Sequence, residues 1–343
     1  MSLSLYCGPR FAPARNGRTQ RALNGDRQYN IGMSAYLQAL NERLAAALAT
    51  LPGEVRQRHA RFIADQQNTD GGFRGRDTES DLYYTGFGLR GLAVLDALTP
   101  DICHRAATYL RGCLTKQTSV VDFFSFLYSC VIVQASSGID VLAGSAADWP
   151  TRVAAELAKF RTSDHGYNKS PGASSGSTYH TFLVGLCFEL LAQKMPNADD
   201  VIRFTQSRRR EDGGYVEVAA MRRSGTNPTA AGIGLLHLLK GRDLPGDEVE
   251  PTIAYLAEMP SMEGGLRAND RIPLADLLST FTGCWTLAQL GALDRIGTRH
   301  AYHYVQSLQR DEGGFLGGVW DEASDVEYTF YGLGSLALLR EFA

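Results

Sequence analysis

The sequence predicts an all-α protein folded as an α6/α6 toroid, a closed ring of six helical-hairpin repeats with Gly-Gly turns. Three observations predict this fold. An acidic-Gly-Gly turn recurs along the chain, an apolar helix follows each turn, and an amphipathic helix precedes it. Self-similarity of this kind along most of a chain indicates a repeat architecture.

The turns are the most regular part of the repeat. Full turns begin at Asp70, Asp212, Glu263 and Glu312, and the segment DHGY at 164–167 is a relative with a single glycine. Glycine adopts the left-handed backbone conformation that often ends a helix. We therefore expect the glycine to cap the preceding helix, and the aromatic or aliphatic side chain after it to fill the junction between repeats.

An apolar helix with a hydroxyl residue near its start follows each turn. The marker hydroxyl residues are Thr85, Ser125, Thr181, Thr229, Thr280 and Thr329. Because these helices are apolar nearly all round, we expect them to be buried on several sides, as the inner layer of a ring. Their glycines, such as Gly88 and Gly232, are expected to let neighbouring backbones approach closely. The helix around Ser125 keeps this pattern but has no Gly-Gly turn before it.

The helices before the turns carry charge on one face and apolar residues on the other. They begin at residues 53, 100, 149, 197, 246 and 298. This pattern suits an outer, half-solvated layer. Closure of the ring removes the exposed ends that the alternative, an open solenoid, must cap. The chain is thus divided into a mobile N-terminal arm, residues 1–32, and a single toroid domain, residues 33–343.

Composition excludes some classes of function. The 343 residues carry a net charge of −3, whereas a protein that binds nucleic acid needs a clear basic excess. No apolar run reaches the roughly 18 residues that predict a membrane span. Four cysteines lie in apolar helical stretches and none forms a C-x-x-C pair: Cys103, Cys130, Cys187 and Cys284. Buried free thiols indicate a reducing compartment, so we expect a cytoplasmic protein.

The repeat resembles that of a known family. The segments QQNTDGGF and LQRDEGGF, each followed by a Thr helix, resemble the repeat of prenyltransferases and squalene cyclases. The resemblance covers nearly the whole chain from residue 54 onward and is closest to the β subunits of protein prenyltransferases. It implies a central cavity that holds an isoprenoid diphosphate, a zinc ion that activates a substrate thiolate, and a helical partner subunit of the α type.

The zinc ligands of that family are only partly matched. The family has the pattern D-x-C at the start of the fifth inner helix, and a His before the Thr of the sixth. Asp276 matches the Asp, but Leu278 stands at the Cys position and Tyr328 at the His position. Leu has no donor atom, and a neutral Tyr is a poor zinc ligand. The resemblance therefore implies a degraded zinc site, and we predict no cofactor.

Three residues are the candidates for catalysis. Asp276 and Tyr328 are expected on adjacent inner helices at the mouth of the ring, where a carboxylate and a phenol could manage an acceptor. The alternative for Tyr328 is a structural plug. His180 stands directly before Thr181; it is either an acid/base group or a hydrogen-bonded histidine of the rim.

Four arginines are the candidates for binding the diphosphate at the rim. Arg222, Arg223, Arg267 and Arg271 lie in two loops that precede inner helices, and the planar guanidinium suits phosphate oxygens. The Lys and the His that the family has in these loops are missing. The alternative is solvated loop charge that Asp270 partly offsets.

Aromatic side chains of the inner helices are expected to line the cavity. The predicted substrate-binding residues are Tyr84, Phe124, Tyr179, Phe281, Trp285 and Tyr331. An aromatic, apolar cavity with a cationic rim suits an isoprenoid or another lipid-like ligand. The alternative is that these aromatic rings simply fill the ring.

Three hypotheses for the function follow. The first is an isoprenoid-handling, prenyltransferase-like enzyme that has lost the zinc-thiolate chemistry and transfers a prenyl group to a non-thiol acceptor. The second is a non-catalytic toroid that binds a lipid or a partner helix. The third is a terpenoid cyclase, although the D-x-D-D-T motif of that branch is incomplete. The nearest segment, DVEYT, has Asp325 and Glu327 but no Asp next to its Thr.

Overall fold

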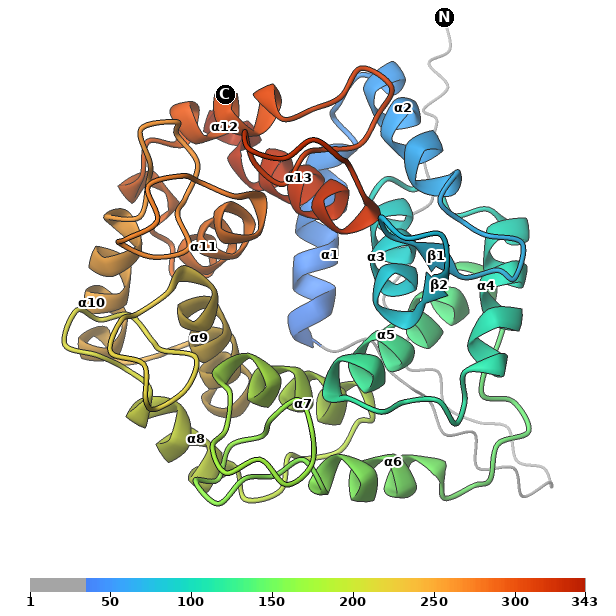
Figure 1. Cartoon of the computed structure of the whole chain (residues 1–343), viewed down its shortest axis with the longest axis horizontal. Helices are drawn as coiled ribbons and strands as arrows, with labels where there is room; N and C mark the ends of the chain where they lie inside the picture. Colours follow the sequence, from blue (N-terminus) through green and yellow to red (C-terminus); the bar gives the residue numbers. More distant parts are fainter. Residues whose placement is uncertain (1–34, 343) are drawn as a thin grey trace, which may run out of the picture. The chain divides into compact units, whose positions relative to one another are not determined.

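The computed structural model describes residues 35–342 of the chain. The predicted N-terminal arm, residues 1–32, lies outside the described residues, as do the first two residues of the predicted toroid domain. Within 35–342 the helices form two concentric layers (Figure 1). The α/α toroid predicted from the repeat is therefore confirmed.

The inner layer consists of every second helix from α3 onward. Its members are α3 (Leu82–Val94), α5 (Val120–Ser137), α7 (Thr178–Leu190), α9 (Thr226–Lys240), α11 (Leu277–Gln289) and α13 (Val326–Leu339). Each of these helices packs against the next, and α13 packs against α3, which closes the ring. Most of their side chains are buried, as expected for helices that are apolar nearly all round.

The outer layer surrounds this ring (Figure 1). Its members are α2 (Gly53–Ala64), α4 (Pro100–Gly112), α6 (Trp149–Ala158), α8 (Ala198–Ser207), α10 (Gly246–Ala257) and α12 (Thr298–Ser307). The remaining short elements are an antiparallel pair of strands and two 3-10 helices: β1 (Phe73–Arg74), β2 (Ser80–Asp81), η1 (Leu293–Arg295) and η2 (Arg340–Phe342).

A buried threonine joins each glycine-containing turn to the inner helix that follows it. The Thr85 hydroxyl accepts the N–H of Phe73 at 2.9 Å and donates to the carbonyl of Asp81, the N-cap of α3, at 2.6 Å. The same pair of bonds recurs at Thr181, Thr229, Thr280 and Thr329. The marker hydroxyl of the sequence is thus a clamp between turn and helix.

The prediction that Ser125 is the marker hydroxyl of α5 was wrong. In the other inner helices the threonine stands four residues after the N-cap, whereas the N-cap of α5 is Ser119, which puts Phe123 at that position. Ser125 makes no pair of bonds of the clamp type. No Gly-Gly turn precedes α5, so no turn N–H needs this acceptor. The helix begins instead with a capping box between Ser119 and Asp122.

The first glycine of a turn lets the turn dock on the next outer helix. Gly71 has a φ of 94°, and an added Cβ would lie 2.0 Å from the carbonyl oxygen of Arg105 in α4. In the last turn, Gly313 has a φ of 105° and meets α2 in the same way. These glycines do not cap the outer helices as expected, because α2 already ends at Ala64 with a right-handed residue after it.

Gly88 and Gly232 leave room for side chains, and not for neighbouring backbones as expected. A Cβ on Gly88 would lie 2.4 Å from the ring of Phe73, and a Cβ on Gly232 would lie 2.8 Å from the ring of Tyr215. Both rings belong to the residue directly after a Gly-Gly pair. The aromatic residue of the turn therefore fills the junction between repeats, as the sequence predicts.

One helix lies inside the ring. α1 (Ala35–Leu48) packs against α3 and α13 and is seen within the inner layer in Figure 1. Its Tyr36 hydroxyl accepts the indole N–H of Trp285 at 3.0 Å, and its Asn41 amide donates to the Tyr128 hydroxyl at 2.6 Å. The repeat pattern does not predict this helix, which reduces the space inside the toroid.

α5 differs from expectation in length. Its 18 residues are long and apolar enough, by length and composition, to cross a membrane, whereas the sequence analysis expected no such stretch. However, 67% of this window is buried within the protein, and the helix packs between α3 and α7. Its apolar surface is therefore explained by its place in the inner layer.

The predicted buried thiols are confirmed. Cys103, Cys130, Cys187 and Cys284 are free and buried, and Cys113 is as well. Burial raises the pKa of the Cys284 thiol to about 12. Because the thiolate is the reactive form, a thiol of this kind is inert at neutral pH.

The clamp predicts a stability effect at Thr229. Thr229→Val keeps the shape of the side chain but leaves the buried N–H of Tyr215 without its acceptor. We expect the free energy of unfolding, measured by urea denaturation, to fall by about 1–3 kcal/mol. Thr229→Ser restores both bonds and should recover most of the loss, and Ser125→Ala is the control without a clamp. Unchanged stability of Thr229→Val would contradict this role.

Candidate functional site

A carboxyl group and a phenol meet inside the ring. Tyr83 and Glu327 are the second residues of α3 and α13, and the Tyr83 hydroxyl donates to Oε1 of Glu327 at 2.6 Å. Burial raises the pKa of Glu327, and the hydrogen bond from Tyr83 offsets only part of that rise. The carboxyl thus keeps its proton to a higher pH than an exposed glutamate does, as a general acid requires.

A cation lies deeper in the same interior. The guanidinium of Arg90 stacks over the rings of Phe87 and Phe330, at 3.9 and 4.9 Å from their centroids. Its Nε donates to the carbonyl of Gly86 at 3.1 Å, so the side chain runs back toward the start of α3. Among residues 35–342 no carboxylate forms an ion pair with Arg90.

Two further tyrosines face this interior. Tyr179 of α7 and Tyr331 of α13 each interact electrostatically with Glu327 and Arg90, which places side chains of three inner helices near one another. Burial raises the pKa of Tyr179 to about 12, although 39% of its surface is accessible. We call Tyr83, Arg90, Tyr179, Glu327 and Tyr331 the interior polar cluster.

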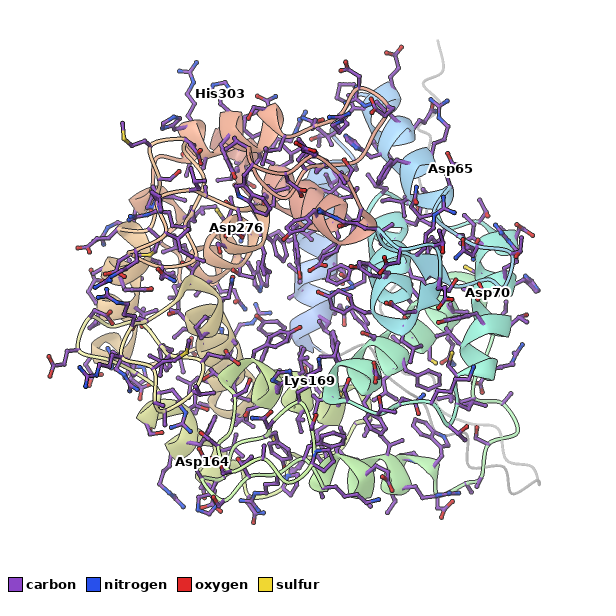
Figure 2. The ribbon with its side chains drawn as sticks, viewed as in Figure 1. Asp65, Asp70, Asp164, Lys169, Asp276 and His303 are labelled. Carbon is purple, nitrogen blue, oxygen red and sulfur yellow. The ribbon has the colours of Figure 1, made fainter. Side chains whose placement is uncertain are left out.

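The predicted catalytic residue Asp276 acts as a helix cap. It is the N-cap of α11 (Figure 2), and its carboxylate accepts the backbone N–H of Ser279 at 2.7 Å and the Ser279 hydroxyl at 2.8 Å. Burial raises its pKa, while the bonds from Ser279 act in the opposite direction. The residue is thus occupied by a structural role in the first turn of α11.

Tyr328 directly follows Glu327, the residue of α13 that meets Tyr83 inside the ring. Its ring packs against Gly317, where a Cβ would lie 2.8 Å away, and Arg76 lies 5.6 Å from its centroid. Asp276 is close enough to influence it electrostatically, and burial raises its pKa to about 12. Among the described side chains, no hydrogen bond joins the Tyr328 hydroxyl to Asp276. The geometry therefore favours the structural plug over the catalytic phenol.

His180 is the third candidate for catalysis. Its Nδ1 lies 2.7 Å from the hydroxyl of Ser177, the N-cap of α7, and that hydroxyl also donates to Glu217. Burial lowers the pKa of His180 to about 4, and Lys169, in the loop before α7 (Figure 2), adds to that effect. The imidazole is therefore neutral at neutral pH. This is the hydrogen-bonded histidine that the sequence analysis held as the alternative.

The residues at the family's zinc position do not fit zinc. Leu278 offers no donor atom, Tyr328 packs as a neutral phenol, and Asp276 has its oxygens on Ser279. Within residues 35–342 no group of three His, Cys, Asp or Glu side chains is arranged to hold a metal ion. Zinc binds four ligands in tetrahedral geometry, mostly Cys and His. We therefore derive no chemistry from a metal at this position.

The four predicted rim arginines differ in their partners. Arg223 pairs with Asp270 at 2.9 Å, and Arg267 donates to backbone carbonyls at the end of α10. Arg222 and Arg271 are exposed and have no ion pair among the described residues. For Arg223 the structure thus agrees with the alternative interpretation, in which Asp270 offsets loop charge.

The predicted aromatic residues divide into two groups. The first group packs against other aromatic rings. The ring centroids of Phe281 in α11 and Tyr331 in α13 lie 5.5 Å apart. Phe124 packs against Tyr128, and Trp285 packs against Tyr36. Tyr84 was expected in the cavity but lies elsewhere. Its ring occupies the space beside Gly75, where a Cβ would lie 2.2 Å from it. Tyr84 therefore packs on the loop that precedes α3.

The residues that face the ring interior and those that pack on their own loop or cap differ by one position in the helix. Tyr84, His180 and Tyr328 stand directly before the clamp threonine and contact their own loop or cap. The residues one position earlier, Tyr83 and Glu327 among them, point into the ring. Successive residues of an α-helix are turned by about 100°, so this shift changes the face. The predicted sites include Tyr84 and Tyr328 but not Tyr83 or Glu327, whereas in α7 they include both Tyr179 and His180.

Arg90 was missed altogether. A signal for it exists in the sequence, because Arg90 is the single charged residue in the otherwise apolar helix LYYTGFGLRGLAV. A charge in a helix that is apolar nearly all round must face either solvent or an interior space with polar partners. The ring places it in the interior.

Comparisons with known proteins agree with the fold. The chain matches the model of the prenyltransferase alpha-alpha toroid domain over residues 45–121 and 102–343. No curated protein matches it at a significant level.

Similar solved structures have several different activities. Protein geranylgeranyltransferase-I from Candida albicans, complexed with GGPP, has a TM-score of 0.59 at 13% identity, over 83% of this chain and 91% of that chain. A variant of the type II terpene cyclase MstE from Scytonema, in complex with geranylgeranyl dihydroxybenzoate, has a TM-score of 0.55 at 13% identity, over 89% and 98%. The GH76A alpha-1,6-mannanase from Salegentibacter has a TM-score of 0.59 at 12% identity, over 85% and 99%. At such identity the likeness shows the fold alone.

The raised pKa of Glu327 predicts a pH dependence of stability. The folded state holds this proton more tightly than the unfolded chain, so the contribution is full below the unfolded pKa of about 4.3 and is lost as pH rises through the folded pKa. Glu327→Gln cannot ionise. Its stability relative to the parent should therefore rise as the pH increases above the unfolded pKa of about 4.3, measured by urea denaturation. The exposed Glu79→Gln is the control, and the same pH dependence in Glu327→Gln and the parent would refute the shift.

Proposed function

The chain belongs to the prenyltransferase alpha-alpha toroid domain family, and on this premise we propose that it is an enzyme that handles an isoprenoid inside its ring. Aromatic side chains gather on the inner helices, since the ring centroids of Phe281, Phe330 and Tyr331 lie within 6.0 Å of one another. Aromatic walls with a few polar groups suit an apolar chain. A sugar would need many more hydrogen-bonding partners.

We assign the role of acid to Glu327. In the proposed step its proton moves to one carbon of an isoprenoid double bond, whose π electrons form the new C–H bond. The other carbon becomes a carbocation, and Glu327 is left as a carboxylate that the Tyr83 hydroxyl stabilises. Attack by a second double bond of the same ligand, followed by return of a proton to Glu327, gives an isomer of the substrate.

The observation that carries this assignment is the bond between Tyr83 and Glu327 in an aromatic interior. A carboxyl group that is buried beside apolar rings and has one hydrogen-bonded oxygen is a recurring arrangement for a general acid. It favours the third hypothesis of the sequence analysis, acid-driven chemistry on the isoprenoid, over the first.

Prenyl transfer from an isoprenoid diphosphate is the second candidate. Arg222 and Arg271 have no ion pair among the described residues and are available to a diphosphate at the rim. Since Leu278 and Tyr328 do not suit zinc, we propose that neither reaction uses zinc at this position. The buried thiols favour a cytoplasmic location, and a helical partner subunit stays a prediction from the resemblance.

Product analysis tests the proposal. The protein is incubated with geranylgeranyl diphosphate or geranylgeraniol, and the products are identified by mass spectrometry. We expect an isomer of unchanged mass, formed at least about 100-fold more slowly by Glu327→Gln. Tyr328→Phe, whose hydroxyl has no bond to Asp276, should retain activity.

Two other results would contradict the proposal. Release of inorganic diphosphate, at equal rates in the parent and in Glu327→Gln, would overturn the acid assignment in favour of prenyl transfer. No reaction and no binding of either compound would support the non-catalytic hypothesis instead.

A further inference from the structure

Three residues that face the ring interior carry hydrogen-bond donors without an acceptor among residues 35–342. The donors are the two Nη groups of Arg90, the hydroxyl of Tyr179 and the hydroxyl of Tyr331, and they come from α3, α7 and α13. Among residues 35–342, the one hydrogen bond of the Arg90 side chain is that of Nε to Gly86. Donors from three different helices thus face one space.

The charge on Arg90 makes this arrangement unusual. A guanidinium away from bulk water costs free energy unless a carboxylate or another acceptor faces it. Here the guanidinium carbon lies 3.9 Å and 4.9 Å from the ring centroids of Phe87 and Phe330, and within residues 35–342 no acceptor faces its two Nη groups. Glu327 interacts electrostatically with Arg90 but forms no ion pair with it within residues 35–342, and its Oε1 accepts a hydrogen bond from Tyr83.

Tyr179 and Tyr331 complete the set of donors. Each feels the charge of Arg90, which lowers the pKa of both hydroxyls by less than burial raises it. Both therefore remain protonated at neutral pH and can donate a hydrogen bond. A cation with two neutral donors beside it is the arrangement that recognises an oxyanion.

We propose that Arg90, Tyr179 and Tyr331 form an oxyanion-binding site inside the ring, which holds a carboxylate or phosphate group attached to the isoprenoid ligand. This site is distinct from the rim arginines. Arg90 stands seven residues beyond Tyr83 along α3, a rise of about 10 Å, although its side chain reaches back toward the mouth. The inference rests on the proposed function, since the apolar part of the ligand is the isoprenoid assigned there.

The site also bears on the acid step. A carbocation formed beside Glu327 would be repelled by an uncompensated Arg90. A ligand that brings its own anion neutralises this charge before the proton is transferred. The interior then holds a neutral pair, which is the less costly state in a space lined by aromatic rings.

Binding of matched ligands tests the site. Farnesoic acid, farnesyl monophosphate and farnesol share one hydrocarbon chain and differ in the head group, so the ratio of their dissociation constants measures recognition of the anion. We expect the parent to bind at least one of the two anions about tenfold or more tightly than the alcohol. The tighter of the two anions identifies the carboxylate or the phosphate as the natural group.

Variants assign this preference to residues. Arg90→Met keeps the packing on Phe87 and should abolish the preference while leaving the affinity for farnesol unchanged. Tyr331→Phe should reduce it by about two- to tenfold. Arg90→Lys should retain part of it, which keeps the test decisive if Arg90→Met fails to fold. Arg223→Met, at the ion pair with Asp270, is the control with no expected effect.

Other outcomes overturn the inference in distinguishable ways. If Arg271→Met abolishes the preference and Arg90→Met does not, the anion binds at the rim. If the parent binds acid, phosphate and alcohol equally, the interior site is refuted while isoprenoid binding stands. If none of the three compounds binds, the proposed function fails together with the site.

Discussion

A buried threonine hydroxyl, bonded on one side to a turn N–H and on the other to an N-cap carbonyl, fixes where five of the inner helices begin. Thr229 shows the arrangement, with the N–H of Tyr215 at 2.9 Å and the carbonyl of Gly225 at 2.7 Å. Because the start of each helix is fixed relative to its turn, the direction of each side chain in the first turn is fixed as well. The clamp therefore decides which residues reach the interior.

The interior polar cluster follows from that geometry. Tyr83 and Glu327 occupy the same position, two residues before the clamp threonine, in the neighbouring helices α3 and α13, and their side chains meet at 2.6 Å. Closure of the ring brings them together across 244 residues of sequence. The same closure places Tyr179 of α7 within electrostatic reach of both. A long-range site thus arises from a short-range rule that each repeat obeys.

The repeat made the fold predictable, whereas the site required the register of each helix. The turns, the clamp threonines and the amphipathic outer helices are local patterns, and each predicted its element correctly. Predictions from a single helix face were less secure. Tyr84 was predicted in the cavity and Tyr328 at the mouth of the ring, although both rings pack on their own loops. The direction of a side chain turns by about 100° per residue, so it cannot be predicted without knowing the cap at which the helix begins.

Two features had no local signal of sufficient strength. α1 lies inside the ring but carries no turn and no clamp, so the repeat pattern passes over it. The partners of Arg90 come from α5 and α13 as well as from its own helix, and no spacing in the sequence relates these rings. Asp276 matches a family ligand in sequence, and in the structure its carboxylate caps α11.

The central claim is that the ring interior holds an isoprenoid with an anionic group. It is tested most directly by incubating delipidated protein with a total lipid extract, then identifying the retained compounds by mass spectrometry after gel filtration. The account predicts retention of an isoprenoid carboxylate or phosphate, and no retention by Arg90→Met. Retention of a sugar or a neutral lipid, or equal retention by the parent and Arg90→Met, would contradict it.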